Sequence, residues 1–114
     1  MRHTSIAQSV QLLHGLGYLY GRYGQPKRAL VLLLIAARMA PDDVGVLRTL
    51  AHVFLLDGAP RRAAAVIERL ATLEGGEHPV LDLLKARVLW ECGQKPEARQ
   101  AFRRYLDRRG PSRQ

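Results

Sequence analysis

The stretches GQPKRA (24–29), GAPRRA (58–63) and GQKPEA (93–98) are three variants of one hexapeptide in a chain of 114 residues. Each begins with Gly, ends with Ala and has a Pro in its interior. The first two begin 34 residues apart and the last two 35 residues apart. A period near 34 residues is typical of helical repeat proteins, so the chain is expected to contain three similar units.

Other residue types recur in register around the three glycines. Small residues lie seven positions before and five positions after each glycine, namely Gly17, Ala51, Ala86, Ala29, Ala63 and Ala98. Large residues lie four positions before and nine positions after it, namely Tyr20, Phe54, Leu89, Leu33, Ile67 and Phe102. Because two helices approach closely only where neither carries a large side chain, this pattern predicts two tightly packed helices in each unit.

The glycine and the proline mark the turn between those helices. Gly adopts the left-handed backbone that ends a helix at little cost, and Pro suits the first turn of the next one. Ser5 and Gln8 form a possible capping box for the first helix, and Asp42 or Asp43 is expected to cap the third. The first predicted helix ends near residue 23. The other five predicted helices span about 26–40, 44–56, 60–73, 79–92 and 96–109.

This pattern resembles the tetratricopeptide repeat (TPR), a 34-residue helix-turn-helix unit with small residues at these points and a closing Pro, here Pro41. The resemblance implies an all-α fold in which three repeats stack as a short right-handed solenoid. It covers one domain, 1–114, with repeats at about 10–43, 44–78 and 79–112. The second and third units depart from the pattern, because Gly75-Gly76 and Gly110 replace the closing Pro. Since no further helix follows the sixth, we expect another chain to complete that end.

The formal charge of +8 comes from 15 Arg and 3 Lys against ten acidic residues. An anionic partner and an ordinary solvated surface both explain this excess. The basic C-terminal stretch contains Phe102 and Tyr105, but both occupy repeat core positions, so no nucleic-acid binding is expected. The longest apolar run, 29–37, is too short to span a bilayer, and no signal peptide is evident. With the single Cys92, this predicts a cytoplasmic protein without membrane insertion.

The resemblance to TPR domains also implies a binding groove along the first helix of each unit. Transferred by register, its inward positions are His14, Tyr18, Arg48, His52, Leu55, Leu56, Leu83, Arg87 and Trp90, with Gln11, Arg22 and Glu91 beside them. Such a mixture of aromatic, aliphatic and basic groups suits an amphipathic helix or an extended peptide. The alternative is that Tyr18 and Trp90 only pack within the stack.

The second helix of the first unit is apolar on its outward side as well. Val31, Leu34 and Ile35 face outward there, whereas the equivalent positions of the later units are mostly polar. A helix that is apolar all round is normally buried. We therefore predict that this convex patch meets a partner, a second copy or the N-terminal segment 1–7.

No residue pattern of catalysis is present. His3, His14, His52 and His78 have no second ligand at metal spacing, and neither a phosphate-binding loop nor a dinucleotide motif occurs. Cys92 lies beside the Gly93 turn and is read as a structural cysteine. We expect a protein that is not an enzyme and that needs no cofactor or metal.

Two stretches are similar to one narrow group of TPR proteins, the small TPR chaperones of bacterial type III secretion of the YscY/SctY kind. They are GYLYGRYGQPKRALVLLLIAARMAPDD (17–43) and WECGQKPEARQAFRRYLD (90–107). The resemblance implies a chaperone in protein transport and virulence. It would shield a small secreted YscX/SctX-like client, one-to-one, before the pair engages the export gate.

The groove and the convex patch would then be client contacts, and the chaperone could self-associate when free of its client. Two alternatives stay open: a chaperone of the needle subunit, and a generic TPR peptide-binding scaffold module. Client chaperoning predicts poor behaviour of the isolated chain, whereas a generic module predicts a soluble monomer.

Overall fold

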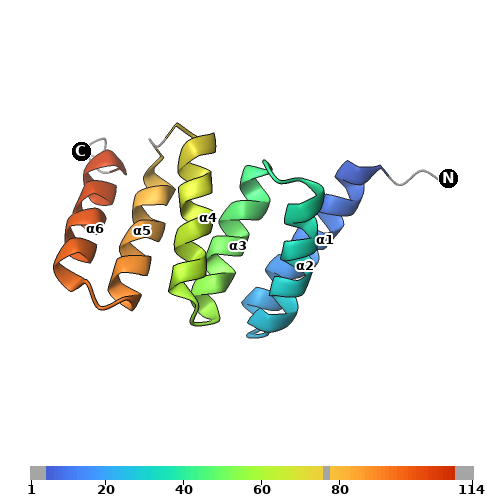
Figure 1. Ribbon diagram of the computed structural model, residues 1–114, viewed down its shortest axis with the longest axis horizontal. Helices are drawn as coiled ribbons and strands as arrows, with labels where there is room; N and C mark the ends of the chain where they lie inside the picture. The colour runs from blue at the N-terminus through green and yellow to red at the C-terminus, as the bar shows by residue number, and fades with distance from the viewer. Residues whose placement is uncertain (1–4, 76–77, 110–114) are drawn as a thin grey trace.

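A computed structural model describes residues 5–75 and 78–109 and is all-helical. None of the described residues forms a strand. The molecule is elongated, with extents of 52 × 29 × 25 Å, and the helices follow one another along its long axis (Figure 1). The six helices are α1 (Ile6–Arg22), α2 (Pro26–Met39), α3 (Val44–Leu56), α4 (Pro60–Leu73), α5 (Pro79–Glu91) and α6 (Lys95–Arg109).

The helix ends follow from the residues that the sequence places there. Ser5 accepts a hydrogen bond from the Gln8 amide while the Gln8 side chain accepts one from the Ser5 amide, which completes the predicted capping box. Asp43, rather than Asp42, caps α3 through the Val46 amide. Prolines occupy the first turns of α2, α4 and α5. The predicted boundaries are confirmed to within about a residue.

The three hexapeptides form the turns within three helical hairpins. Hairpin 1 is α1–α2, hairpin 2 is α3–α4 and hairpin 3 is α5–α6. Their glycines have positive φ, namely 75° at Gly24, 74° at Gly58 and 82° at Gly93. Besides packing on its sequence neighbours, α3 contacts both α1 and α5 directly, whereas α2, α4 and α6 do not contact one another. These contacts are consistent with a helical repeat stack whose inner row is α1, α3 and α5.

The small residues of the repeat lie where the helices of each hairpin meet. All six are buried. A Cβ atom built on Gly17 would lie 2.6 Å from Cγ of Leu33, so α1 and α2 approach too closely there for any side chain on Gly17. The predicted role of the small positions, close helix packing, is therefore confirmed in hairpin 1.

The large residues of the repeat behave differently at the C-terminal end of the stack. Leu33 and Ile67 are 0% and 2% exposed, but the equivalent Phe102 is 43% exposed. The prediction that Phe102 is a core residue is thus wrong. Leu33 and Ile67 are covered by the hairpin that follows each of them, and no described residue takes that place beside α6.

Candidate protein-binding surfaces

The predicted groove contains one hollow between α1 and α3, with a volume of about 340 Å³. Tyr18 and Leu56 contribute exposed apolar area to it, and His52 and Arg22 contribute its polar groups. The rest of the lining is Gly21, Thr49 and Val53. An aromatic ring beside an aliphatic side chain and the cationic Arg22 matches what binds a short apolar anchor of another protein.

Tyr18 and Arg22 are one helical turn apart on α1 and contact each other. Nη1 of Arg22 donates to the Tyr18 hydroxyl over 3.4 Å, and the guanidinium lies 6.0 Å from the ring centroid. The hydrogen bond, followed by the charge interaction with Tyr18, raises the pKa of Arg22 above its already high ordinary value. Arg22 is a permanent cation at the edge of the hollow.

Two polar contacts join neighbouring hairpins across the inner row. His14 Nε2 lies 2.8 Å from the Thr49 hydroxyl, and Nη1 of Arg87 lies 2.7 Å from His52 Nδ1. Burial, and secondly the Arg87 charge, lowers the pKa of His52 below its ordinary value. His52 is therefore neutral at physiological pH, with Nδ1 accepting from Arg87. These histidines fix the spacing between hairpins as well as lining the surface.

Two of the predicted groove residues have other roles. Leu55 is only 7% exposed and belongs to the core that α5 covers, so its assignment to the groove is wrong. It lies one position, or about 100° of helix, from the exposed Leu56, and that rotation points it at the next hairpin. Arg48 is half-buried and forms an ion pair with Glu74 of hairpin 2, which the sequence pattern did not predict.

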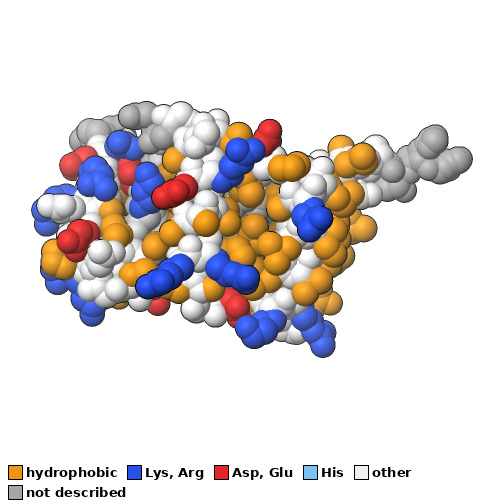
Figure 2. Space-filling view, viewed as in Figure 1, with side chains coloured by type: hydrophobic (Ala, Val, Ile, Leu, Met, Phe, Trp, Pro, Cys, Tyr) orange, Lys and Arg blue, Asp and Glu red, His pale blue; other side chains and the backbone are white. Residues whose placement is uncertain are grey.

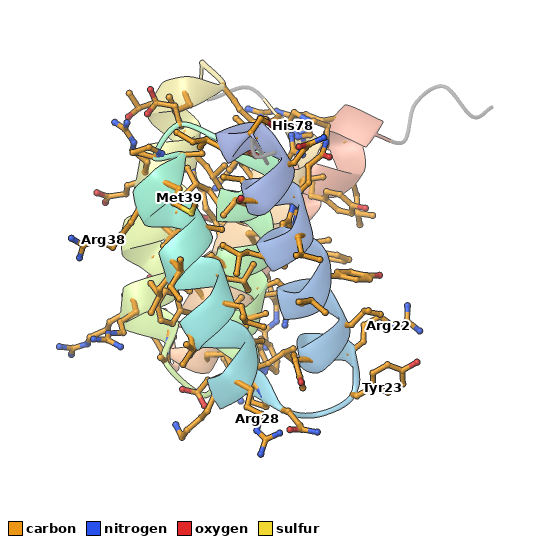
Figure 3. All side chains as sticks on the ribbon, turned by 90° about the vertical axis from the view of Figure 1, so that its right-hand side faces the viewer. Arg22, Tyr23, Arg28, Arg38, Met39 and His78 are labelled. Carbon is orange, nitrogen blue, oxygen red and sulfur yellow. The ribbon has the colours of Figure 1, made fainter. Side chains whose placement is uncertain are left out.

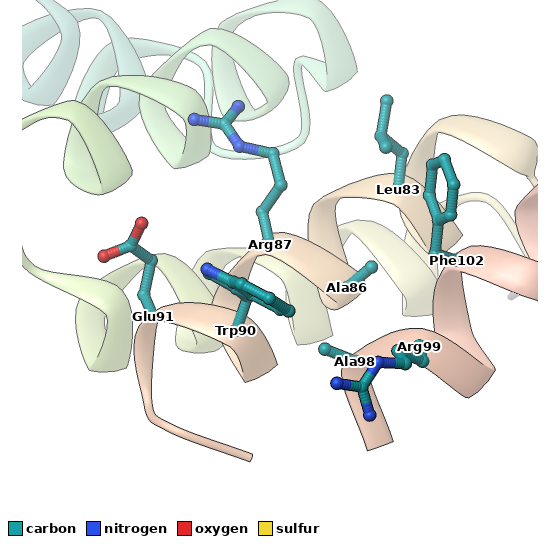
Figure 4. A pocket seen from close by; sticks show the side chains of 8 residues that line it. All are labelled: Leu83, Ala86, Arg87, Trp90, Glu91, Ala98, Arg99 and Phe102. Atoms are coloured by element: carbon teal, nitrogen blue, oxygen red, sulfur yellow. The ribbon is translucent and has the colours of Figure 1, made fainter. Parts of the chain in front are cut away.

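Leu83, Arg87 and Trp90 line a second depression, at the C-terminal end of the stack. This terminal cleft, of about 400 Å³, lies between α5 and α6 (Figure 4). Trp90 is 48% exposed, with Nζ of Lys95 4.5 Å from its ring centroid. The other lining residues are Ala86, Glu91, Ala98, Arg99 and Phe102. Trp90 is exposed as predicted, and it lines the same cleft as Phe102, which lies beside Leu83 (Figure 4).

The convex patch is exposed. Val31, Leu34 and Ile35 all keep more than a third of their surface accessible. Hydrophobic side chains gather over α2 and the surface next to it, whereas charged side chains are dispersed over α4 to α6 (Figure 2). Residues 1–4 of the segment predicted to fold over the patch lie outside the described residues, and Ile6 is itself exposed.

An apolar row on α1 was not predicted from the sequence. Leu12, Leu16 and Leu19 are exposed at the N-terminal end of the stack. Figure 3 looks at this end and shows α1 beside α2, with Arg22, Arg28 and Arg38 at the periphery. The signal was available, because the residues 34 positions later, Val46, Leu50 and Val53, are apolar too.

An ion pair joins the two helices of hairpin 3. Arg108 of α6 forms a 2.8 Å ion pair with Asp82 of α5, whose side chain is buried.

Among the described residues no three His, Cys, Asp or Glu side chains are grouped to hold a metal ion. No helix in the described part of the chain is long and apolar enough to cross a membrane.

A comparison with models of known protein families finds no match for this chain, and a search of curated proteins finds no significant relative.

Proposed function

We propose that this chain is a non-enzymatic TPR-type protein whose hairpins stack as a right-handed solenoid and bind another protein. The repeated residues of the sequence, their burial between paired helices and the continuous inner row of α1, α3 and α5 support the TPR assignment. The observation that carries the binding function is the exposure of apolar groups on two surfaces, the hollow of Tyr18 and Leu56 and the convex patch of α2.

The partner that fits these surfaces is an amphipathic helical segment. Two anchors would enter the groove, one beside Tyr18 and one beside Leu56, and a second apolar segment would cover the convex patch. Burying Val31, Leu34 and Ile35 would contribute roughly 1.5–3 kcal/mol each before the entropic cost of association. Such a partner would itself be poorly soluble alone, because it must present apolar faces to both surfaces.

We further propose that the chain is a cytoplasmic type III secretion chaperone of the YscY/SctY kind, with a small YscX/SctX-like secreted client. The support is the resemblance of 17–43 and 90–107 to that group, together with an exposed apolar helix in the first repeat. The chaperone would bind one client, keep its helices shielded and present the pair to the export gate.

Light scattering on purified samples tests this proposal. The chain is measured alone and after co-expression with the short reading frame next to its gene. A stable complex with one copy of each chain supports a dedicated chaperone. A chain that never co-purifies with its neighbour's product refutes that assignment, and micromolar binding of unrelated amphipathic peptides would then indicate a generic TPR module.

A further inference from the structure

The two ends of the stack carry the two halves of one interface. Inside the molecule, the first helix of one hairpin packs against the hairpin before it, and this contact occurs twice. We call the surface of the incoming helix the donor face and the surface that it covers the acceptor face. The donor face of α1 has no hairpin before it among the described residues, and the acceptor face of hairpin 3 has none after it. Both faces present large exposed hydrophobic side chains.

The donor face is defined by how α3 and α5 pack. On α3, Val46 packs against Val10 and Ala36 of hairpin 1, and a Cβ atom on Gly21 would lie 3.2 Å from Val53. The residues of α5 that correspond to this face are Leu81, Leu84 and Val88, and all three are buried in the core that includes hairpin 2. The same register on α1 gives Leu12, Gly15 and Leu19, with Leu16 between them.

The acceptor face is likewise defined by equivalent residues. Leu55 and Ile67 of hairpin 2 are buried in the core beneath α5. Their counterparts in hairpin 3 are Trp90 and Phe102, which line the terminal cleft (Figure 4). Ala51 corresponds to Ala86, the small residue in the floor of the cleft. The cleft thus has the residue types of a filled acceptor face, with larger aromatic groups.

We propose that α1 of a second copy docks in the terminal cleft, so that chains associate head to tail. Leu12, Leu16 and Leu19 of one copy would cover Trp90 and Phe102 of the other. The charged residues of the cleft are Arg87, Arg99 and Glu91, so the contact would rest on the apolar side chains of the two faces. A second copy is favoured over an unrelated helix because this chain already forms the same contact twice.

Head-to-tail contacts leave one donor face and one acceptor face free in every assembly, so association continues with concentration unless a ring closes. The proposal does not rest on the proposed function, because it uses Leu12, Leu16 and Leu19 of α1 and the terminal cleft rather than the Tyr18 hollow or the convex patch. Trp90 is the only tryptophan of the sequence, so its fluorescence reports directly on occupation of the cleft.

The experiment combines sedimentation velocity with Trp90 fluorescence over a wide range of chain concentrations. We expect the average mass to rise above 12.8 kDa with concentration and the Trp90 emission to shift to shorter wavelength in parallel.

Leu16→Glu on the donor face and Phe102→Glu on the acceptor face should each weaken association by roughly tenfold or more, because each buries a carboxylate. Gln100→Glu, on an exposed residue of α6 outside the cleft, is the matched control and should leave association unchanged.

Mixing the two defective variants gives the decisive result. Leu16→Glu keeps an intact cleft and Phe102→Glu keeps an intact donor face, so an equimolar mixture should form a species of two chains and no larger one. Restoration on mixing also shows that both variants are folded. A wild-type chain that stays monomeric at millimolar concentration overturns the proposal, as does a mixture that fails to associate while the wild type does.

Discussion

Two glycines of α1 illustrate how a single methyl group has opposite effects at two sites. Gly17 lies against Leu33 in the core, whereas Gly15 has no neighbouring atom within 4 Å of an added Cβ. Replacing glycine with alanine favours a helix by about 1 kcal/mol where space is free. Where a buried neighbour must move, overpacking costs about 1–3 kcal/mol.

We therefore expect Gly15→Ala to raise the free energy of unfolding by about 0.5–1 kcal/mol and Gly17→Ala to lower it. Urea unfolding followed by circular dichroism, at a concentration where the chain is monomeric, measures both. Equal stabilisation by the two substitutions would show that α1 and α2 are not in the close contact described.

His52 makes stability depend on pH. Its pKa is lowered in the folded state, first by burial and then by the Arg87 charge, so the unfolded chain binds protons more readily. The contribution of His52 to the free energy of unfolding is therefore fully present above the ordinary histidine pKa of about 6.5. It decreases as pH falls through that value towards the lower folded pKa. Below the folded pKa this contribution no longer changes.

The expected result is a wild-type unfolding free energy that is lower at acid pH than at neutral pH, with a smaller difference in His52→Gln. An NMR titration of the His52 ring provides the direct check. A His52 midpoint at or above the ordinary histidine value would contradict the contact with Arg87 as described.

At the scale of single helices, the two adjacent acidic residues before α3 have different roles. Asp43 accepts from the Val46 amide, and Val46 is fully buried, whereas Asp42 forms an exposed ion pair with Arg69. Asp43→Ala should lower the unfolding free energy by about 0.5–2 kcal/mol. Asp42→Ala should change it by less than about 1 kcal/mol. Thermal unfolding of the two variants side by side would identify the cap, and a larger loss for Asp42→Ala would contradict it.

A double substitution on α2 tests the role of the convex patch. Leu34→Asp with Ile35→Asp replaces two exposed apolar side chains with charges, so helix formation should persist while client binding is lost or the chain becomes less soluble. The matched control is Glu68→Asp with Arg69→Asp at the equivalent positions of α4, which should leave binding intact. Co-purification with the client measures the result. A soluble double variant of α2 that still forms the complex would remove the patch from the binding surface.

The helices were predictable because their signals are local. Capping residues, prolines and turn glycines act within a few positions of themselves, and the three glycines at a period near 34 placed the turn inside each hairpin. The side of a helix that a residue faces was less predictable. Leu55 and Leu56 are neighbours in sequence, and only the position of α5 decides that the first is core and the second is surface.

At the scale of the whole molecule, the remaining errors come from the ends of the stack. Phe102 has the residue type of an interior position, and a repeat pattern assigns it as if another hairpin followed. Its exposure depends on whether a hairpin packs beside it rather than on its own sequence context. The ion pairs Arg48–Glu74 and Arg108–Asp82 also required the folded arrangement, because they join separate helices.

The most direct test of the central claim, that the inner row and the α2 patch bind a protein client, is amide hydrogen exchange of the chain with and without its co-purified client. We expect slowed exchange in α1, α3 and α2, centred on the segments that contain Tyr18, Leu56 and Val31. Unchanged exchange in those segments, or protection confined to α4, would contradict it.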